Sequence, residues 1–324
     1  MSTRKNAALL AASLAIALSA LETAHAEDAA PTRASAPEAP LTTLEKARKN
    51  GTIVIGHRTA SVPFSYLDSS RQPTGYAKEL CDRIVKAIRR EFNMPQLKII
   101  YRAVTARERL PMLRNGMIDL ECGSSTITAE RQKHADFSIV YFISSVRLLT
   151  RRAYDIRGLD DLADKTIVFT TGTTAESVIQ EKLDIERHRI AVVEGKTHAA
   201  SFLMVRTGRA AAYMTNEDLL AGLIANARDP NAYEIVGPPL SVEHYAIMMR
   251  KGDVQLKNSV DKALVDIIVS GEMKELYDRW FTHPLPPSGA NLNLPMSAEL
   301  EQLFARQANA ANTRPPAAQG ARRQ

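Results

Sequence analysis

Short β-branched runs alternate along most of the chain with segments of helical character. Strands are predicted at residues 52–56, 97–101, 118–121, 146–150, 166–170, 210–214 and 243–250. Helices are predicted, from apolar periodicity and from capping boxes, at residues 76–92, 105–116, 173–182, 197–208, 217–227, 254–269 and 271–281. The capping boxes pair Thr105 with Glu108 and Thr173 with Glu176. This alternation is typical of α/β lobes with mainly parallel sheets.

Two segments of the chain, residues 105–124 and 197–216, repeat one pattern. Each predicts a helix, a glycine that ends it, a short apolar strand and then a polar loop. Two such units predict two similar lobes whose polar loops meet across a cleft. We expect the chain to cross between the lobes near residues 142–147 and 240–248. Lobe one would then hold residues 41–145 and 246–306, and lobe two residues 146–245.

The two ends of the chain depart from this pattern. An apolar stretch at residues 7–21 follows two basic residues, and an Ala-His-Ala sequence ends at residue 26. Residues 1–26 are therefore predicted to be a cleaved signal peptide, because the stretch is too short to be a comfortable membrane anchor. Residues 27–40 are predicted to be a disordered linker and residues 307–324 a disordered tail. The mature protein is expected to be soluble and located in the periplasm.

The composition excludes several classes of protein. The net charge is +6, but Lys and Arg are spread along the chain, and aromatic residues make up only 6% of it. This indicates a solvated basic surface and no nucleic-acid partner. The sequence contains two cysteines, Cys81 on a predicted helix and Cys122 at the end of a predicted strand. Neither has a His or Cys at ligand spacing, so we expect no metal site and no cofactor.

The two cysteines fall in the same predicted lobe of an exported protein. A disulfide between Cys81 and Cys122 is therefore expected, because the compartment permits one. It would close a loop of about 40 residues and contribute ~3–4 kcal/mol. The alternative is a pair of buried free thiols.

Several motifs together resemble one protein family over about residues 41–305. They include Gly51-Thr-Ile-Val-Ile-Gly-His-Arg58, Glu121-Cys-Gly-Ser-Ser-Thr126, Glu130-Arg131-Gln132 and Thr170-Thr-Gly-Thr-Thr174. The chain resembles the periplasmic solute-binding proteins of polar amino acid ABC importers, in their glutamate/aspartate branch. This implies a two-lobed type II periplasmic-binding-protein (Venus flytrap) fold with a two-strand hinge. It also implies a monomer without enzymatic activity that delivers an acidic amino acid to an inner-membrane ABC permease.

The resemblance also implies a set of ligand contacts. An acidic amino acid needs cationic groups around its carboxylates, and the planar guanidinium of Arg binds a carboxylate in bidentate fashion. By resemblance, Arg131 would hold the α-carboxylate, and Arg58 and Arg109 the side-chain carboxylate. Thr170 and Thr173 precede a helix N-terminus, whose free N–H groups suit an anion. The full predicted set is Arg58, Arg109, Ser124, Thr126, Arg131, Thr170, Thr173, His198 and Asn216.

Two positions depart from the family pattern. Position 106 is Ala where relatives usually have Ser, and position 216 is Asn where they usually have an Asp that pairs with the ligand's ammonium. Asn216 can accept a hydrogen bond but brings no charge. A charge-assisted hydrogen bond contributes roughly 1.5–3 kcal/mol against ~1 for a neutral one. The substitution predicts weaker amino-acid binding or a shift to an amine-free dicarboxylate.

Two other classes of function are open at this point. One is an exported dehydratase on the same scaffold, acting on a prephenate-like substrate with Glu121, Glu217 or His198 as general acid or base. The sequence offers no nucleophile–base pair to support it. The other is a ligand-sensing subunit, which would need a separate membrane protein to pass on the signal.

Overall fold

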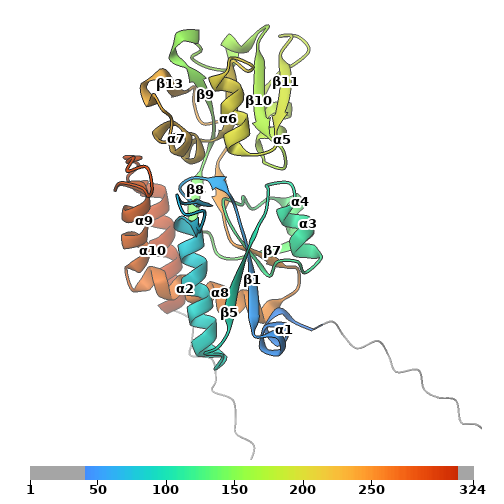
Figure 1. The fold of residues 1–324 in the computed structure, drawn as a ribbon, viewed down its shortest axis with the longest axis vertical. Coiled ribbons are helices and arrows are strands. Elements are labelled where there is room, and N and C mark those ends of the chain that lie inside the picture. Colours follow the sequence, from blue (N-terminus) through green and yellow to red (C-terminus); the bar gives the residue numbers. More distant parts are fainter. Residues whose placement is uncertain (1–40, 313–324) are drawn as a thin grey trace, which may run out of the picture. The chain divides into compact units, whose positions relative to one another are not determined.

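The computed structural model describes residues 41–312 (Figure 1). The predicted signal peptide and linker, residues 1–40, lie outside the described residues, and so does the part of the predicted tail at 313–324. Lobe one is the name used here for the first five-stranded sheet and its helices, and lobe two for the second five-stranded sheet and its helices.

The sheet of lobe one has the order β5-β1-β6-β15-β7. Its strands are β1 (Thr52–His57), β5 (Lys98–Ala103), β6 (Leu120–Cys122), β7 (Ala135–Phe137) and β15 (Met248–Arg250). Strand β1 pairs in parallel with β5 and β6, and β15 runs antiparallel to both of its neighbours. The buried Ile53 and Ile55 of β1 contribute to the core of this lobe.

The sheet of lobe two repeats this arrangement, with the order β11-β10-β12-β9-β13. Its strands are β9 (Val146–Arg151), β10 (Thr166–Thr170), β11 (Ala191–Gly195), β12 (Ala212–Asn216) and β13 (Tyr233–Val236). Here β10 pairs in parallel with β11 and β12, and β9 is antiparallel. The sequence predicted mainly parallel sheets, but both sheets are mixed. The antiparallel β9 and β15 follow directly on the two hinge strands, where the chain enters each sheet.

The helices pack on the sheets as their apolar faces require. In lobe one, α2 buries Leu80, Ile84 and Ile88, the face seen in the sequence. In Figure 1, α2, α9 and α10 lie on one side of β1 and β5, and α3 lies on the other. The helices of lobe one are α1 (Thr43–Asn50), α2 (Tyr76–Glu91), α3 (Arg109–Arg114), α4 (Ala129–Gln132), α8 (Val254–Val269), α9 (Glu272–Phe281) and α10 (Ala298–Asn312). Those of lobe two are α5 (Ala175–Lys182), α6 (His198–Arg206) and α7 (Glu217–Ala225).

Two short strands connect the sheets, as the two crossings predicted. Strand β8 (Phe142–Ser144) pairs antiparallel with β14 (Glu243–Tyr245). The strand predicted at 243–250 is thus two strands in two sheets, because the chain leaves β14 and joins the sheet of lobe one as β15. A small sheet, β2 (Ala60–Ser61), β3 (Ser65–Leu67) and β4 (Pro73–Thr74), and the 3-10 turns η1 (Arg152–Tyr154), η2 (Leu159–Leu162) and η3 (Pro230–Ala232) complete the elements.

Helix α10 corrects the prediction of a tail that starts at residue 307. The helix continues to Asn312, so residues 307–312 are helical. Leu300 and Phe304 are buried in the core of lobe one, and Gln307 Nε2 donates to the Val140 carbonyl at 3.0 Å. These contacts hold the helix, although its exposed Ala- and Gln-rich sequence resembles that of a disordered segment.

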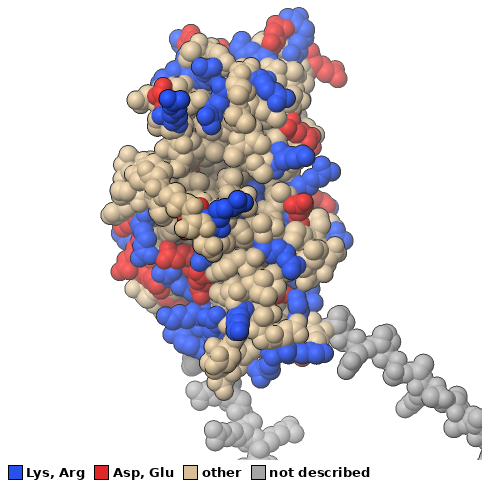
Figure 2. All heavy atoms as spheres, viewed as in Figure 1, with Lys and Arg blue, Asp and Glu red and all other residues tan. Residues whose placement is uncertain are grey.

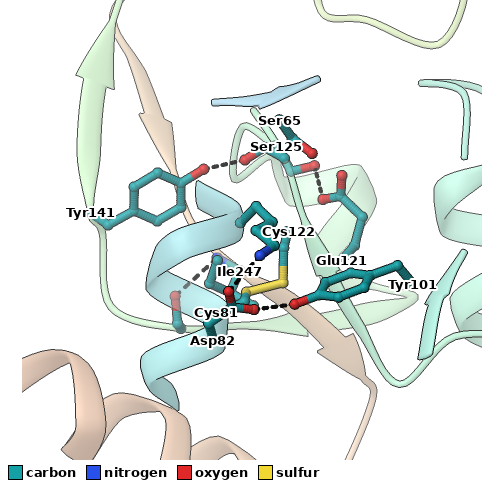
Figure 3. The surroundings of a disulfide bond; sticks show 12 residues. Ser65, Cys81, Asp82, Tyr101, Glu121, Cys122, Ser125, Tyr141 and Ile247 are labelled. Atoms are coloured by element: carbon teal, nitrogen blue, oxygen red, sulfur yellow. Dashed lines mark hydrogen bonds and ion pairs between the residues drawn. A yellow bond between two sulfur atoms is a disulfide. The ribbon is translucent and has the colours of Figure 1, made fainter. Parts of the chain in front are cut away.

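The predicted disulfide is confirmed: Cys81 on α2 is bonded to Cys122 at the end of β6 (Figure 3). Both residues are fully buried in the core of lobe one. The bond therefore fixes the end of β6 to α2, one residue before the loop at Gly123–Thr126.

Charged side chains are dispersed over the surface. On the face seen in Figure 2, Lys and Arg lie on both lobes in small groups, with Asp and Glu between them. No helix among residues 41–312 is long and apolar enough to cross a membrane.

Candidate ligand-binding site

A small cavity collects polar side chains from both lobes. It leaves about 220 Å³ of space not filled by atoms, part of it open to solvent. Eight of the nine residues predicted as ligand contacts line it, whereas Thr170 does not. The lining residues are Arg58, Arg109, Ser124, Thr126, Arg131, Thr173, Thr174, His198, Asn216 and Leu219.

The two sheets explain why these residues meet. Arg58 follows β1 directly, Ser124 lies in the loop after β6, and Asn216 is the last residue of β12. Thr173 lies in the loop after β10. β1 runs parallel to β6, and β10 runs parallel to β12, so these residues lie outside the carboxyl ends of parallel strands, where open α/β sheets bind ligands.

Two buried arginines of lobe one lie close together in this cavity. Arg58 and Arg109 are each 3% exposed. Arg109 Nη1 donates to the Ser124 carbonyl at 3.2 Å and to Ser125 Oγ. The Arg58 guanidinium makes no hydrogen bond or ion pair with the residues at 41–312. Burial, and next the Arg109 charge, lower the pKa of Arg58 to about 10. An anion placed here would relieve both effects.

A buried carboxylate, that of Glu121, compensates part of the positive charge of the cavity arginines. Glu121 is fully buried on β6, 3.9 Å from Arg109 Nη1, and accepts from Ser125 Oγ (Figure 3). Its Oε1 accepts no hydrogen bond from the residues at 41–312. A Cβ at Gly123 would lie 2.5 Å from this atom and 2.8 Å from Arg58 Cγ, so a larger residue there would displace these two buried side chains. Glu121 does not line the cavity, which supports a structural role and removes it as a candidate acid or base.

Arg131 joins the two lobes directly. Its Nη1 donates to the Thr126 carbonyl at 2.8 Å in lobe one, and its Nη2 donates to the Gly172 carbonyl at 3.1 Å in lobe two. Burial and the Arg109 charge lower the pKa of Arg131 to about 9, and the charges of Glu243 and Glu121 oppose that shift. Arg131 can therefore close the site as well as bind an anion.

In lobe two, Thr170 belongs to a buried polar cluster instead of the cavity. It is fully buried, and its Oγ1 is 2.8 Å from both Ser201 Oγ and Tyr213 OH. Thr173 lines the cavity, but its Oγ1 donates to the Thr170 carbonyl at 2.7 Å. The predicted capping box with Glu176 is therefore wrong, and α5 begins after Thr174, whose side chain makes no capping hydrogen bond.

His198 is the first residue of α6 and is 1% exposed. Its Nδ1 lies 2.6 Å from Tyr213 OH, and its Nε2 has no hydrogen-bond partner at 41–312. Burial, followed by the charges of Arg58 and Arg109, holds the pKa of His198 well below its usual value. The imidazole is consequently neutral at physiological pH, and it can offer a hydrogen bond to a ligand without adding charge.

Asn216, which stands where relatives usually have Asp, is held by Glu243, a residue outside the predicted set of ligand contacts. Asn216 Nδ2 donates to Glu243 Oε2 at 2.8 Å, and Thr126 Oγ1 donates to the same oxygen at 2.6 Å. Glu243 is 4% exposed and lies on hinge strand β14. One feature of the sequence pointed to it: in the strand predicted at 243–250, Glu243 and Tyr245 are two residues apart and lie on the same face. Thr174 and Leu219 of the cavity lining were also missed, and Ala106 is buried outside it.

Other kinds of site find no support among the described residues. No group of His, Cys, Asp and Glu at 41–312 is arranged to hold a metal ion. Glu217, the other carboxylate considered for catalysis, is 39% exposed and pairs with Arg147 Nη1 at 3.5 Å, outside the cavity lining.

Comparison with known proteins places this architecture. The L-glutamate/L-aspartate-binding protein of Pseudomonas aeruginosa is 44% identical over 81% of this chain and 87% of its own length. The glutamate/aspartate import solute-binding protein of Escherichia coli K12 is 41% identical over 90% of this chain and 94% of its own. Among solved structures, an ancestral amino acid-binding protein described as a precursor of cyclohexadienyl dehydratase has a TM-score of 0.65 at 27% identity. That alignment covers 75% of this chain and 100% of that one.

These likenesses agree with the paired mixed sheets and the two connecting strands. The chain has the two-lobed fold of type II periplasmic binding proteins. The model of the bacterial extracellular solute-binding proteins, family 3, matches residues 53–283. Together with the identities above, this match shows that the chain belongs to family 3 of the bacterial extracellular solute-binding proteins.

Proposed function

We propose that this chain is the extracytoplasmic binding component of an ABC importer and that it captures glutamate or aspartate between its two lobes. The observation that carries the proposal is the cavity itself, in which three arginines of lobe one face His198, Thr173 and Asn216 of lobe two. The names of the relatives above support the same class of ligand. The ligand contacts proposed are the eight predicted residues that line the cavity.

The charges around the cavity favour a ligand of net charge −1. Arg58, Arg109 and Arg131 are cationic, and His198 is neutral. Two carboxylates outside the lining contact it: Glu121 is paired with Arg109, and Glu243 accepts hydrogen bonds from Thr126 and Asn216. With both carboxylates ionised, the site carries one excess positive charge. Glutamate and aspartate carry one net negative charge at neutral pH and cancel it. An amine-free dicarboxylate with two negative charges leaves an uncompensated buried charge, which is costly.

The proposed mechanism is closure around the ligand. Lobe one offers the guanidinium groups, and lobe two completes the site only when the lobes meet, so a ligand that contacts both selects the closed state. The hinge would be the pair of connecting strands β8 and β14. The lobe boundaries would then fall between residues 145 and 146 and between residues 245 and 246. Direct contacts such as Arg131 to Gly172 add to closure.

The setting of this activity is part of the proposal. A signal peptide at residues 1–26 would export the chain to the periplasm, where it would act as a monomer and deliver its ligand to an inner-membrane permease. The family match supports an extracytoplasmic location.

A thermal-shift panel tests the proposal. Ligand-stripped protein is heated with each amino acid and with amine-free diacids at one fixed concentration. A ligand that binds only the folded state raises the unfolding temperature by an amount that grows with the logarithm of its affinity. We expect glutamate and aspartate to give the largest shifts. A larger shift with a basic or apolar amino acid, or conversion of a prephenate-type substrate, would contradict the proposal.

A further inference from the structure

One buried carboxylate controls two side chains of the cavity at once. Glu243 is absent from the cavity lining, yet its Oε2 accepts hydrogen bonds from Thr126 Oγ1 at 2.6 Å and from Asn216 Nδ2 at 2.8 Å. Thr126 lies in the loop after β6 and Asn216 ends β12, so the carboxylate bridges the two lobes. Its Oε1 accepts a longer hydrogen bond from Ser241 Oγ at 3.5 Å.

These hydrogen bonds determine what the two neutral side chains can offer a ligand. A threonine hydroxyl has one hydrogen, and Thr126 gives it to Glu243, so its oxygen can only accept from the cavity. A carboxylate only accepts, so the amide of Asn216 must turn its nitrogen to Glu243. Asn216 Oδ1 is then left as an acceptor without a partner at residues 41–312. Both side chains therefore present a hydrogen-bond acceptor to the cavity.

We propose that Glu243 is a positioning residue that determines specificity, because it fixes Thr126 and Asn216 as hydrogen-bond acceptors and so makes their corner of the cavity a site for an ammonium group. The inference rests on the proposed function and deepens it, since it selects an amino acid over an amine-free dicarboxylate. The negative charge expected at position 216 is supplied from position 243 instead, one hydrogen bond behind the cavity.

The rest of the cavity has the opposite polarity. Arg58, Arg109 and Arg131 can only donate, which suits carboxylates. An ammonium group has three donors and no acceptor, so it satisfies the Thr126 and Asn216 oxygens, whereas a keto or methylene group leaves them unpaired in a buried place. The two ends of the cavity therefore match the two ends of an amino acid and reject its deaminated analogue.

The test is Glu243→Gln, with calorimetric titration of L-glutamate and of 2-oxoglutarate. A glutamine side chain keeps the shape, but its amide can donate as well as accept, and the charge is lost. We expect the preference for glutamate over 2-oxoglutarate to fall at least tenfold. Glu217→Gln is the matched control, because Glu217 directly follows Asn216 in the chain but pairs with Arg147 and makes no hydrogen bond to the Asn216 side chain. It should leave the preference unchanged.

A charge swap separates positioning from a merely structural role. In the double variant E243Q/N216D, the carboxylate moves to position 216 and can accept from the glutamine amide, so the preference for glutamate should return. An equal loss of affinity for both ligands in E243Q, or an unchanged preference, would overturn the inference, and so would a double variant without recovery.

The wild-type protein supplies a measurement that does not depend on any variant's folding. The inference requires it to bind glutamate at least tenfold more tightly than 2-oxoglutarate. Equal binding of the two would overturn the inference but leave the acidic-ligand proposal standing. Failure to bind glutamate or aspartate at all would overturn both.

Discussion

Asp218 connects lobe two to both hinge strands and carries a stability prediction. It lies in the first turn of α7 and is 1% exposed. Its Oδ1 accepts from Ser144 Oγ on β8, and its Oδ2 accepts from Tyr245 OH on β14 at 3.4 Å. Burial raises the pKa of Asp218 to about 7, the charges of Glu217 and Glu243 act in the same direction, and the Ser144 hydrogen bond opposes them.

The sign of the effect follows from the direction of this shift. The pKa of Asp in an unfolded chain is about 3.9, so between roughly pH 4 and 7 the folded state holds a proton that the unfolded state has lost. The free energy of unfolding therefore falls as the pH rises through this window. A shift of about three units corresponds to about 4 kcal/mol at most. Asp218→Asn is neutral at every pH, so the variant should match the wild type near pH 4 and exceed its stability by up to about 4 kcal/mol above pH 7.

Urea unfolding of the ligand-free, disulfide-intact protein at several pH values between 4 and 8.5 measures this difference. The gap between Asp218→Asn and wild type should widen by about 1.4 kcal/mol per pH unit from 4 to 7 and then level off. Glu194→Gln is the control, because Glu194 is an exposed carboxylate of β11 that is not among the groups shifting the pKa of Asp218, and it should show no comparable widening. A gap that stays constant with pH would show that Asp218 is not protonated in the folded state and would refute the reasoning.

The remaining predictions concern closure, binding and the disulfide. Arg131→Ala should weaken glutamate binding roughly 30-fold or more, since truncating one partner of a buried charged pair costs about 2–5 kcal/mol; Arg114→Ala, an exposed arginine of α3, should not, and equal effects in calorimetry would remove Arg131 from the site. Gly172→Ala should hold the lobes apart, because its Cβ would lie 2.6 Å from the Arg107 backbone in lobe one. Ligand should then fail to reduce the radius of gyration of this variant in X-ray scattering, and a reduction as large as that of the wild type would contradict the prediction. Replacing Cys81 and Cys122 together by Ser should lower the free energy of unfolding by ~3–4 kcal/mol in urea, whereas a change below ~1 kcal/mol would show that the bond contributes little.

Much of this architecture follows from sequence pattern because strand ends and helix faces are local properties. The repeat at residues 105–124 and 197–216 predicted two lobes, and the last residue of each segment, Ser124 and Asn216, lines the same cavity. The resemblance to the family then selected the arginines that face it. Position 216 could be recognised as a departure, but its hydrogen bond to Glu243 joins residues far apart in the chain.

The errors have physical causes that no local pattern reveals. Thr170 ends a strand beside the cavity, but its side chain is buried in the cluster with Ser201 and Tyr213 and does not reach the lining. Several threonines at 170–174 could have capped α5, and Gly172, with a φ of +77°, turns the backbone so that the helix starts after Thr174. Glu243 was overlooked because its importance lies in which groups it touches across the hinge.

Calorimetric titration of ligand-stripped protein with L-glutamate and L-aspartate is the most direct test of the account. The cavity polarity and the single excess positive charge predict a one-to-one complex with at least one of them, and clearly weaker binding of glutamine, which lacks the second carboxylate. Glutamine binding as tight as that of glutamate, or no heat with either acidic amino acid, would contradict the central claim that three arginines and a positioned acceptor corner select an acidic amino acid.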